Sequence, residues 1–272
     1  MPHVAGIFIY PIKSCRGHAV SAASVGPWGF EHDRQYMIVS PAGEFFTQRQ
    51  LPRMALIDPA LSAQGVTLTA PDYPEIKVAR PASRAAVTLA VNVWSDTVLA
   101  DDCGDAVSAW LTGFLGLPAR LVHAGTDYFR PVKPSKALLG DTVSFADGYP
   151  FLAISEASVA HLNDRIVATG EDAVPADRFR ANLVIADCAP FAEDEWTRVR
   201  LGEIIFRNAG PCARCVVTTT DQHTGERGKE PLRTLASFRR DSADPTAVNF
   251  GVNLIHETKT GTVRVGDTVT LL

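Results

Sequence analysis

Residues 210–220 read Gly-Pro-Cys-Ala-Arg-Cys-Val-Val-Thr-Thr-Thr, which places a pair of cysteines between a Gly-Pro turn signal and a β-branched run. The run at 216–220 predicts a strand. We therefore expect Cys212 and Cys215 at the entrance of that strand, with Arg214 between them. A nearby cation favours the thiolate form of a cysteine, which is the form that ligates metals and attacks substrates.

Four interpretations of this cysteine pair differ in what they require of the rest of the chain. A structural zinc site normally needs two such pairs, and the chain has one. A redox pair usually opens a helix near the start of a βαβ unit, whereas this pair lies late and precedes a predicted strand. Two inert buried thiols are the simplest interpretation. The fourth is a single thiolate ligand to a soft metal that another molecule mainly holds.

The composition is that of a globular protein, with 46% apolar and 21% charged residues among 272. The net charge of −4 argues against a general nucleic-acid binder, because neutralising phosphates requires a basic excess. No apolar run approaches the roughly 20 residues of a membrane span, and the N-terminus lacks the basic flank of a signal peptide. We therefore expect a cytoplasmic protein whose five cysteines, an odd number, are thiols rather than a disulfide framework.

The first hundred residues predict a mostly β domain. The clearest helix follows at 104–116, where apolar residues recur at i, i+3, i+4, i+7 and i+8 from Val107. Pro118 marks a plausible joint, so we expect one domain at 1–118 and another at 119–272. Strands are expected at 4–10, 19–25, 35–40, 61–70, 75–79 and 86–89.

Residues 119–272 predict a second β-rich domain with two further helices. One helix begins after Ser155, whose hydroxyl can cap it, and a short one spans 232–238. Strands are expected at 151–154 and 183–185, and residues 261–271 predict a closing hairpin. The expected fold class is α+β, mainly β with a few helices.

Basic residues recur at the ends of predicted strands. Lys13 and Ser14 follow the first strand, Arg34 enters a later one beside an aspartate, and Arg180 and Asn182 precede another. Such donors suit a phosphate or another anion. Taken alone, each is also explained by an exposed basic turn or by a surface ion pair that contributes little.

Taken together, these segments resemble the MOSC-domain molybdenum proteins. The resemblance is closest to the branch that contains the mitochondrial amidoxime-reducing component and its bacterial relatives, which reduce N-hydroxylated bases. It spans nearly the whole chain and rests on the shared order and spacing of individually weak motifs. These are IYPIKSC at 9–15, DR at 33–34, TQRQ at 47–50 with PR at 52–53, DCG at 102–104, PFL at 150–152, SEAS at 155–158, FRAN at 179–182, CARC at 212–215 and KEPL at 229–232.

The resemblance implies a MOSC-type β-barrel preceded by an N-terminal, MOSC-associated β-rich domain. It also implies a molybdenum cofactor (Mo-molybdopterin) with one protein cysteine as a further metal ligand. By position in the family this ligand, and the catalytic cysteine, is Cys215, and a thiolate suits a metal already bound by sulfur. The implied cofactor-binding positions are Lys13, Ser14 and Arg34 at the phosphate end, Arg180, Asn182, Ala213 and Arg214 around the pterin and metal, Asp147, Gly148 and Tyr149 in a turn whose residue types differ from the family's, and Phe250 as a nearby aromatic.

The activity that the resemblance implies is reduction of the N–O bond of small N-hydroxylated substrates such as amidoximes. Two other roles remain open: a non-catalytic carrier of the molybdenum cofactor or of sulfur, and a metal-free β-barrel scaffold with buried thiols. Only three dispersed cysteines lie outside the pair, and no GxGxxG turn joins a strand to a helix. We therefore expect electrons to come from a separate flavoprotein with a haem or iron–sulfur carrier.

Overall fold

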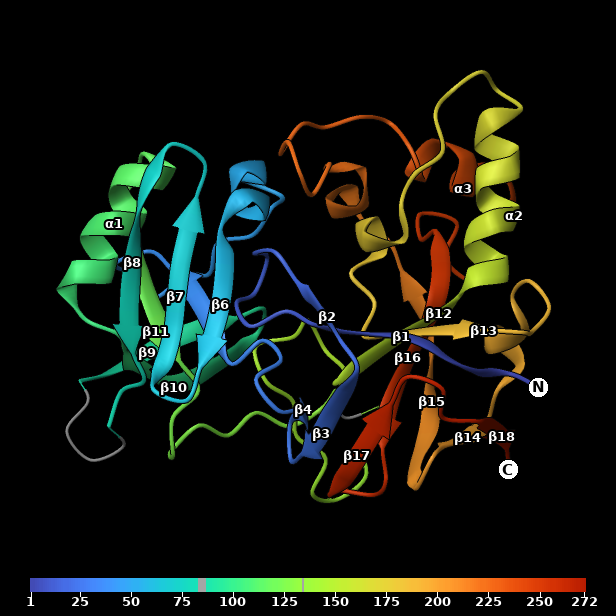
Figure 1. Cartoon of the computed structure of the whole chain (residues 1–272), viewed down its shortest axis with the longest axis horizontal. Helices are drawn as coiled ribbons and strands as arrows, with labels where there is room; N and C mark the ends of the chain where they lie inside the picture. The colour runs from blue at the N-terminus through green and yellow to red at the C-terminus, as the bar shows by residue number, and fades with distance from the viewer. Residues whose placement is uncertain (83–86, 134) are drawn as a thin grey trace.

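The structure is a computed structural model that describes residues 1–82, 87–133 and 135–272. Strands dominate it, and they group into two lobes (Figure 1), one on the left with mostly cyan and green strands and one on the right with mostly yellow, orange and red strands. This mainly β architecture with a few helices confirms the expected α+β fold class.

The right-hand lobe of Figure 1 is built on an eight-stranded sheet that contains both the first and the last strand of the chain. In sheet order its strands are β18 (Val269–Leu271), β14 (Arg198–Leu201), β15 (Ile204–Ala213), β16 (Asn249–His256), β12 (Phe151–Ser155), β13 (Leu183–Ala186), β1 (His3–Ile9) and β2 (His18–Val20). Neighbours are antiparallel except β12 and β13. A parallel pair needs a crossover connection, and α2 (Glu156–Val167) lies within it.

Three smaller sheets complete the described strands. The first contains β5 (Tyr36–Val39), β11 (Arg120–His123), β10 (Asp96–Asp102) and β9 (Thr88–Val93). The second contains β6 (Asp58–Ser62), β7 (Gly65–Ala70) and β8 (Tyr73–Ala79). The third contains β17 (Gly261–Arg264), β3 (Ala22–Gly26) and β4 (Gly29–Phe30). The sheets are shared across residue 118, because β11 pairs with β5 and β17 pairs with β3. A domain boundary at residue 118 therefore stays a prediction from the sequence.

Helix α1 (Asp105–Leu115) forms where the apolar stripe predicts it. Its buried residues, among them Trp110 and Phe114, pack into the core that lies against β7 and β8. Gly116 has a φ of 76° and ends the helix in the left-handed conformation that glycine favours.

Helix α2 begins at the predicted cap. The Ser155 hydroxyl accepts a hydrogen bond from the Ser158 amide at 3.0 Å, which satisfies one of the free amides of the first turn. The third helix, α3 (Leu232–Phe238), follows Pro231 as expected. Four short 3-10 helices lie in the connections: η1 (Pro52–Leu56), η2 (Ala176–Phe179), η3 (Ala192–Glu195) and η4 (Val216–Thr219).

The strand predicted at 216–220 is wrong, because the chain forms η4 there. The hydroxyls of Thr218 and Thr219 donate to the carbonyls of Cys215 and Val216 at 3.0 and 2.8 Å. These local bonds replace the ladder bonds of a strand, and β-propensity decides little where no partner strand lies alongside. The strand instead leads into the cysteine pair, since β15 contains Cys212 and ends at Ala213, two residues before Cys215.

Three further predictions about strands differ from the structure. Residues 261–271 do not form a closing hairpin, because β17 pairs with β3 and β18 with β14. The single strand expected at 61–70 is divided between β6 and β7, which form a hairpin that turns ahead of Gly65, where φ is 154°. The strand expected at 86–89 begins at a residue outside those described, and β9 starts at Thr88.

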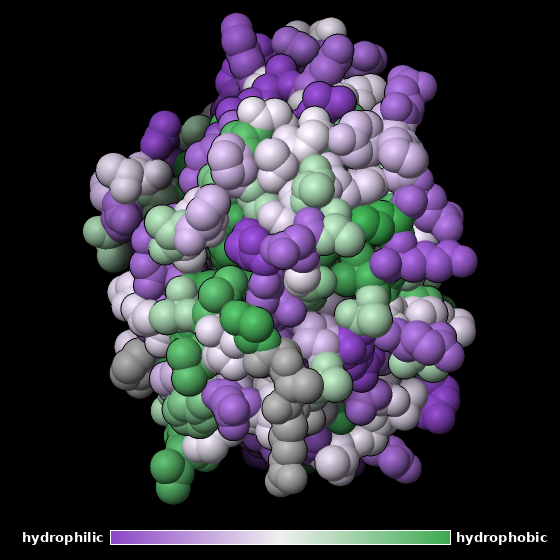
Figure 2. Space-filling view, turned by 90° about the vertical axis from the view of Figure 1, so that its left-hand side faces the viewer, coloured by the Kyte–Doolittle hydropathy of each residue, from purple (hydrophilic) through white to green (hydrophobic). Residues whose placement is uncertain are grey.

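The left-hand face of the molecule carries hydrophilic and hydrophobic side chains side by side, with apolar ones gathered toward the lower left (Figure 2). Exposed large apolar residues of this lobe include Leu61, Val87 and Leu99. No helix in the described part of the chain is both long and apolar enough to cross a membrane.

Candidate functional site

A cavity of about 160 Å³ is lined by residues from both lobes. The structure brings every predicted site residue except Phe250 to its wall. These residues are Lys13, Ser14, Arg34, Asp147, Gly148, Tyr149, Arg180, Asn182, Ala213, Arg214 and Cys215. They come from the connections after β1, before β5, before β12 and β13, and between β15 and η4, so the loops at the ends of several strands converge on one place.

Phe250 lies behind the wall instead of in it. Its side chain is fully buried and stacks on Phe179, with ring centroids 4.2 Å apart and an interplanar angle of 25°. Phe179 lines the cavity. Phe250 therefore lies near the site in a second aromatic layer, and Phe179 is the aromatic that reaches the cavity.

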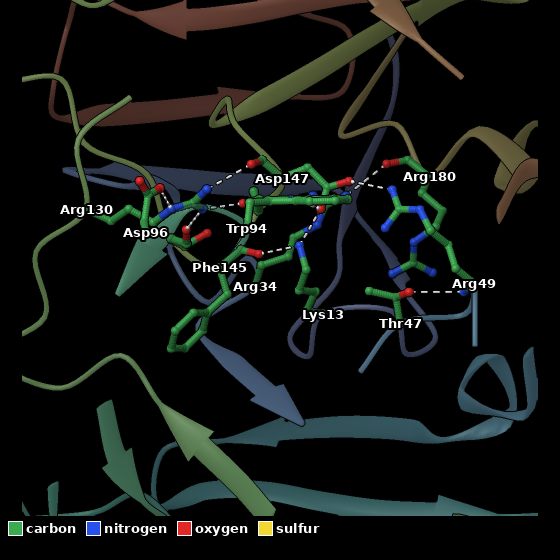
Figure 3. Close-up of polar contacts among 12 residues, drawn as sticks. Lys13, Arg34, Thr47, Arg49, Trp94, Asp96, Arg130, Phe145, Asp147 and Arg180 are labelled. Carbon is green, nitrogen blue, oxygen red and sulfur yellow. Dashed lines mark hydrogen bonds and ion pairs between the residues drawn. The ribbon is translucent and has the colours of Figure 1, made fainter. Parts of the chain in front are cut away.

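Lys13 is a buried ammonium at the bottom of the site. Its Nζ donates to the carbonyl oxygen of Phe145 at 2.8 Å and to the carboxylate of Asp147 (Figure 3). Burial lowers the pKa of Lys13, and the Asp147 charge opposes that shift. Partial desolvation alone would raise the pKa of Asp147, but Lys13 and Arg49 offset it and hold that pKa well below its usual range.

Arg130 fixes the backbone of the turn that carries Asp147. Its guanidinium donates to the carbonyl oxygens of Ser144, Ala146 and Asp147 at 3.1, 2.5 and 2.9 Å. Its Nε donates to the carboxylate of Asp96 at 2.7 Å. The sequence gives no role to Arg130, because an arginine in a predicted loop just before two prolines carries no signal of what it contacts.

Arg34 joins three parts of the site. Its Nη1 donates to Asp33 Oδ2 at 2.7 Å and to Asn182 Oδ1 at 2.9 Å, and its Nη2 donates to the Arg180 carbonyl at 3.0 Å. The guanidinium also lies 4.2 Å from the centroid of the Tyr10 ring. Burial raises the pKa of Asp33 even though Arg34 opposes that shift, so the pair lies in a poorly solvated place.

Arg180 is a second buried guanidinium against Tyr10, 4.4 Å from the ring centroid. Its Nη1 donates to Gln222 Oε1 at 3.1 Å. Burial lowers the pKa of Arg180 to about 10, and the nearby charge of Arg34 acts in the same direction. Among the described residues nothing hydrogen-bonds its buried Nη2, so this cation has donor capacity left for a ligand.

The two cysteines have different surroundings. Cys212 Sγ accepts a hydrogen bond from Arg214 Nη1 at 2.9 Å, and Arg214 Nη2 donates to the Phe179 carbonyl at 2.6 Å. The hydrogen bonds of this guanidinium within the described part of the chain therefore include one to Cys212 and none to Cys215. Cys215 lies one residue later at the start of η4, where its carbonyl accepts the Thr218 amide at 3.0 Å. Both thiols are half-buried and both line the cavity.

Three site residues other than glycine have a left-handed backbone. Ser14, Arg34 and Arg180 have φ values of 66°, 48° and 54°. Such conformations cost on the order of 1–3 kcal/mol each and persist where the surrounding structure determines them. Here they turn the side chains of three separate loops toward one cavity.

Thr47 and Arg49 also line the cavity, although the sequence indicates no role for them beyond their place in a motif. Between them Gln48 is fully buried, and its Nε2 donates to the Ser14 carbonyl and to Gln222 Oε1, both at 2.9 Å. A polar Thr-Gln-Arg run in an apolar neighbourhood was the available signal. Its contact with the far end of the chain could not be read from the sequence.

The donor set of the cavity fits a negatively charged, metal-carrying group. Within residues 1–82, 87–133 and 135–272, no three His, Cys, Asp or Glu side chains are placed to hold a metal ion. A metal at Cys212 or Cys215 would therefore need further ligands from a bound molecule. Cationic side chains outnumber acidic ones in the wall. Its acidic residue is Asp147, and its cationic residues are Lys13, Arg34, Arg49, Arg180 and Arg214. Arg214 Nε, like Arg180 Nη2, is buried without a partner among the described residues.

Comparison with known proteins places the chain in a family. Residues 1–118 match the MOSC N-terminal beta barrel domain, and residues 140–270 match the MOSC domain. The chain is 35% identical over 286 residues to mitochondrial amidoxime-reducing component 1 of Homo sapiens, covering 99% of this chain and 82% of that protein. It is 35% identical to the molybdenum cofactor sulfurase of Danio rerio, covering 93% of this chain but 32% of that protein. The chain therefore belongs to the MOSC family, which confirms the resemblance seen in the sequence.

Proposed function

We propose that this protein is a molybdenum-cofactor-dependent oxidoreductase that reduces the N–O bond of N-hydroxylated substrates such as amidoximes. The observation that carries the proposal is the convergence of a cysteine pair and five cationic side chains on one cavity. The near full-length similarity to a protein named for amidoxime reduction supports the substrate class.

The residues of the cavity have separate tasks in this proposal. Lys13, Ser14 and Arg34 would hold the phosphate end of the cofactor, since a lysine, a hydroxyl and a guanidinium are suitable phosphate donors. Arg180, Asn182 and Arg214 would contact the pterin. Cys215 would supply the thiolate ligand. Asp147, held by Lys13 and Arg130, would lie beside the bound substrate.

The overall reaction takes an amidoxime, two electrons and two protons to an amidine and water. When bound, the cofactor supplies the two-electron chemistry of this reduction. The chain's own residues bind and orient the reactants, and the low exposure of Lys13 and Arg34 keeps bulk water from the inner wall.

We propose a separate electron donor, a flavoprotein with a haem or iron–sulfur carrier. The five cysteines include only three outside the pair, too few and too scattered for an iron–sulfur centre. All five are unpaired, which supports the cytoplasm as the proposed location.

The alternative is a carrier of the cofactor or of sulfur without catalysis. Two half-buried thiols in one cavity favour it, since either could hold a transferable sulfur. The similarity to the sulfurase is to about a third of that protein and does not bring its activity with it.

One experiment separates these roles. The protein is purified under argon, its molybdenum is measured, and it is mixed anaerobically with benzamidoxime and a reduced viologen dye. Formation of benzamidine by molybdenum-containing protein supports the reductase. Full molybdenum content without benzamidine favours the cofactor carrier, and absence of molybdenum from protein made with ample cofactor supply contradicts both the reductase and the cofactor carrier.

A further inference from the structure

Trp94 is an unusual residue for the place it occupies. It is the first of two residues in the loop between β9 and β10, and its φ is 60°. Glycine, asparagine and aspartate favour such a position, whereas a bulky side chain there is strained. The indole is 48% exposed although it is large and apolar. Strain and exposure together indicate a role other than core packing.

The indole lies at the rim of the cavity, in contact with two of its lining residues. Its Nε1 donates to Asp147 Oδ1 at 3.3 Å. The guanidinium carbon of Arg49 is 4.7 Å from the ring centroid, and Phe45 packs edge-on at 5.3 Å. Figure 3 shows Trp94 beside Asp147.

Trp94 and Asp147 form one corner of the cavity rim, and the position of Arg49 indicates which groups this corner can bind. A guanidinium is a planar, delocalised N–C–N cation, and this one lies against the indole and 3.5 Å from Asp147 Oδ2. It forms no hydrogen bond with the described residues. The side chain therefore occupies the corner loosely, held by an aromatic face and a carboxylate. The same pair of groups would hold any small planar N–C–N head group.

We propose that Trp94 and Asp147 form the recognition element for the planar N–C–N head group of the substrate, with Arg49 occupying this corner in its absence. This inference rests on the proposed function and narrows its substrate class to N-hydroxylated amidines and guanidines. Trp94 is a specificity-determining residue in this scheme: its ring stacks on the head group while Asp147 accepts its N–H groups. Hydroxylamines without an N–C–N plane gain nothing from the ring.

The test measures binding and does not depend on turnover. Benzamidine has the planar head group, and benzylamine has a similar size and charge without it. Calorimetric titration of the holoprotein with each gives the two dissociation constants. Trp94→Leu should weaken benzamidine binding by roughly five- to tenfold, the effect of losing the aromatic face on which its planar cation stacks. Trp94→Phe keeps an aromatic face and should lose much less.

Benzylamine binding should fall less than benzamidine binding in Trp94→Leu, because its ammonium has no plane to stack on the indole and keeps its contact with Asp147. Molybdenum content is measured in each preparation, so that a variant that has lost cofactor is recognised. Unchanged benzamidine binding in Trp94→Leu overturns the inference, as does an equal loss for both ligands with Trp94→Phe as impaired as Trp94→Leu. Failure of the wild-type holoprotein to bind benzamidine also overturns it. Dye-driven reduction of benzamidoxime would still stand in that case, which keeps this failure distinct from failure of the proposed function.

Discussion

Replacing Arg34 by methionine tests whether its charge holds the site together. The substitution keeps an unbranched side chain against Tyr10 and removes three hydrogen bonds, to Asp33, Asn182 and the Arg180 carbonyl. It leaves the Asp33 carboxylate, 2% exposed, without its cation. Removing one partner of a buried ion pair costs about 3–5 kcal/mol, so we expect Arg34→Met to lower the free energy of unfolding by about 3 kcal/mol.

The pH dependence has a definite sign. Burial already raises the pKa of Asp33 against the opposing charge of Arg34, and loss of that charge raises it further. The native variant then binds a proton that the unfolded chain releases. Its stability therefore falls as the pH rises above the unfolded-state pKa of Asp33, until the native pKa is passed. The deficit relative to wild type should be smallest in mild acid and largest at mildly alkaline pH.

Urea unfolding is measured in mild acid and at mildly alkaline pH, on preparations with equal molybdenum content. It gives the free energy of unfolding of wild type and variant under each condition. The matched control is the double variant Asp33→Asn/Arg34→Met, in which the buried carboxylate that lost its cation is removed as well. It should recover most of the lost stability and still retain less molybdenum than wild type, because the cavity has lost a cation. A double variant as unstable as Arg34→Met, or one with full molybdenum at limiting cofactor supply, would refute the reasoning.

Three further predictions concern the metal ligand, the turn at Asp147 and the electron source. Cys215→Ser replaces a soft donor by a hard one and should reduce dye-driven turnover by orders of magnitude, whereas Cys212→Ser should be mild; equal losses would contradict the choice of ligand. Arg130→Met leaves three carbonyl oxygens without their donor and should lower the free energy of unfolding by about 2–4 kcal/mol, and a wild-type urea midpoint would argue against it. With NADH alone the pure holoprotein should form no benzamidine, while a reduced viologen dye should drive the reaction; steady turnover on NADH would reveal an internal electron relay.

Local sequence signals were sufficient to predict the helices, whose formation depends on residues close together in the chain. The stripe of α1 and the cap at Ser155 each depend on residues within a few positions, and the structure confirms both. The strand predicted from the β-branched run at 216–220 was wrong, because a strand needs the hydrogen bonds of a neighbouring strand. The threonine hydroxyls there bond to backbone carbonyls of their own turn instead. Pairing partners such as β17 with β3 are equally beyond local patterns.

The site was predictable where a motif marked it, and otherwise not. Lys13, Arg34 and Arg180 lie in motifs of the family resemblance, and the structure brings them to one cavity. Arg130 and Trp94 lie outside any motif. Their importance comes from contacts with Asp147, which is 17 and 53 residues away along the chain. No pattern of composition or period reports a contact at such a separation.

The electrostatics of the cavity explain why its strained loops are maintained. Arg34 and Arg180 lie against the same tyrosine ring, and the lowered pKa of Arg180 reflects burial first and the charge of Arg34 next. Two guanidiniums this close to one another repel each other, and Asp33 pairs directly with only one of them. An anionic ligand that reached the free Nη2 of Arg180 would relieve this repulsion and satisfy a buried donor at the same time. The unfavourable charge arrangement, like the left-handed backbone at Ser14, Arg34 and Arg180, is therefore better understood as preparation for a bound anion than as a property of the protein alone.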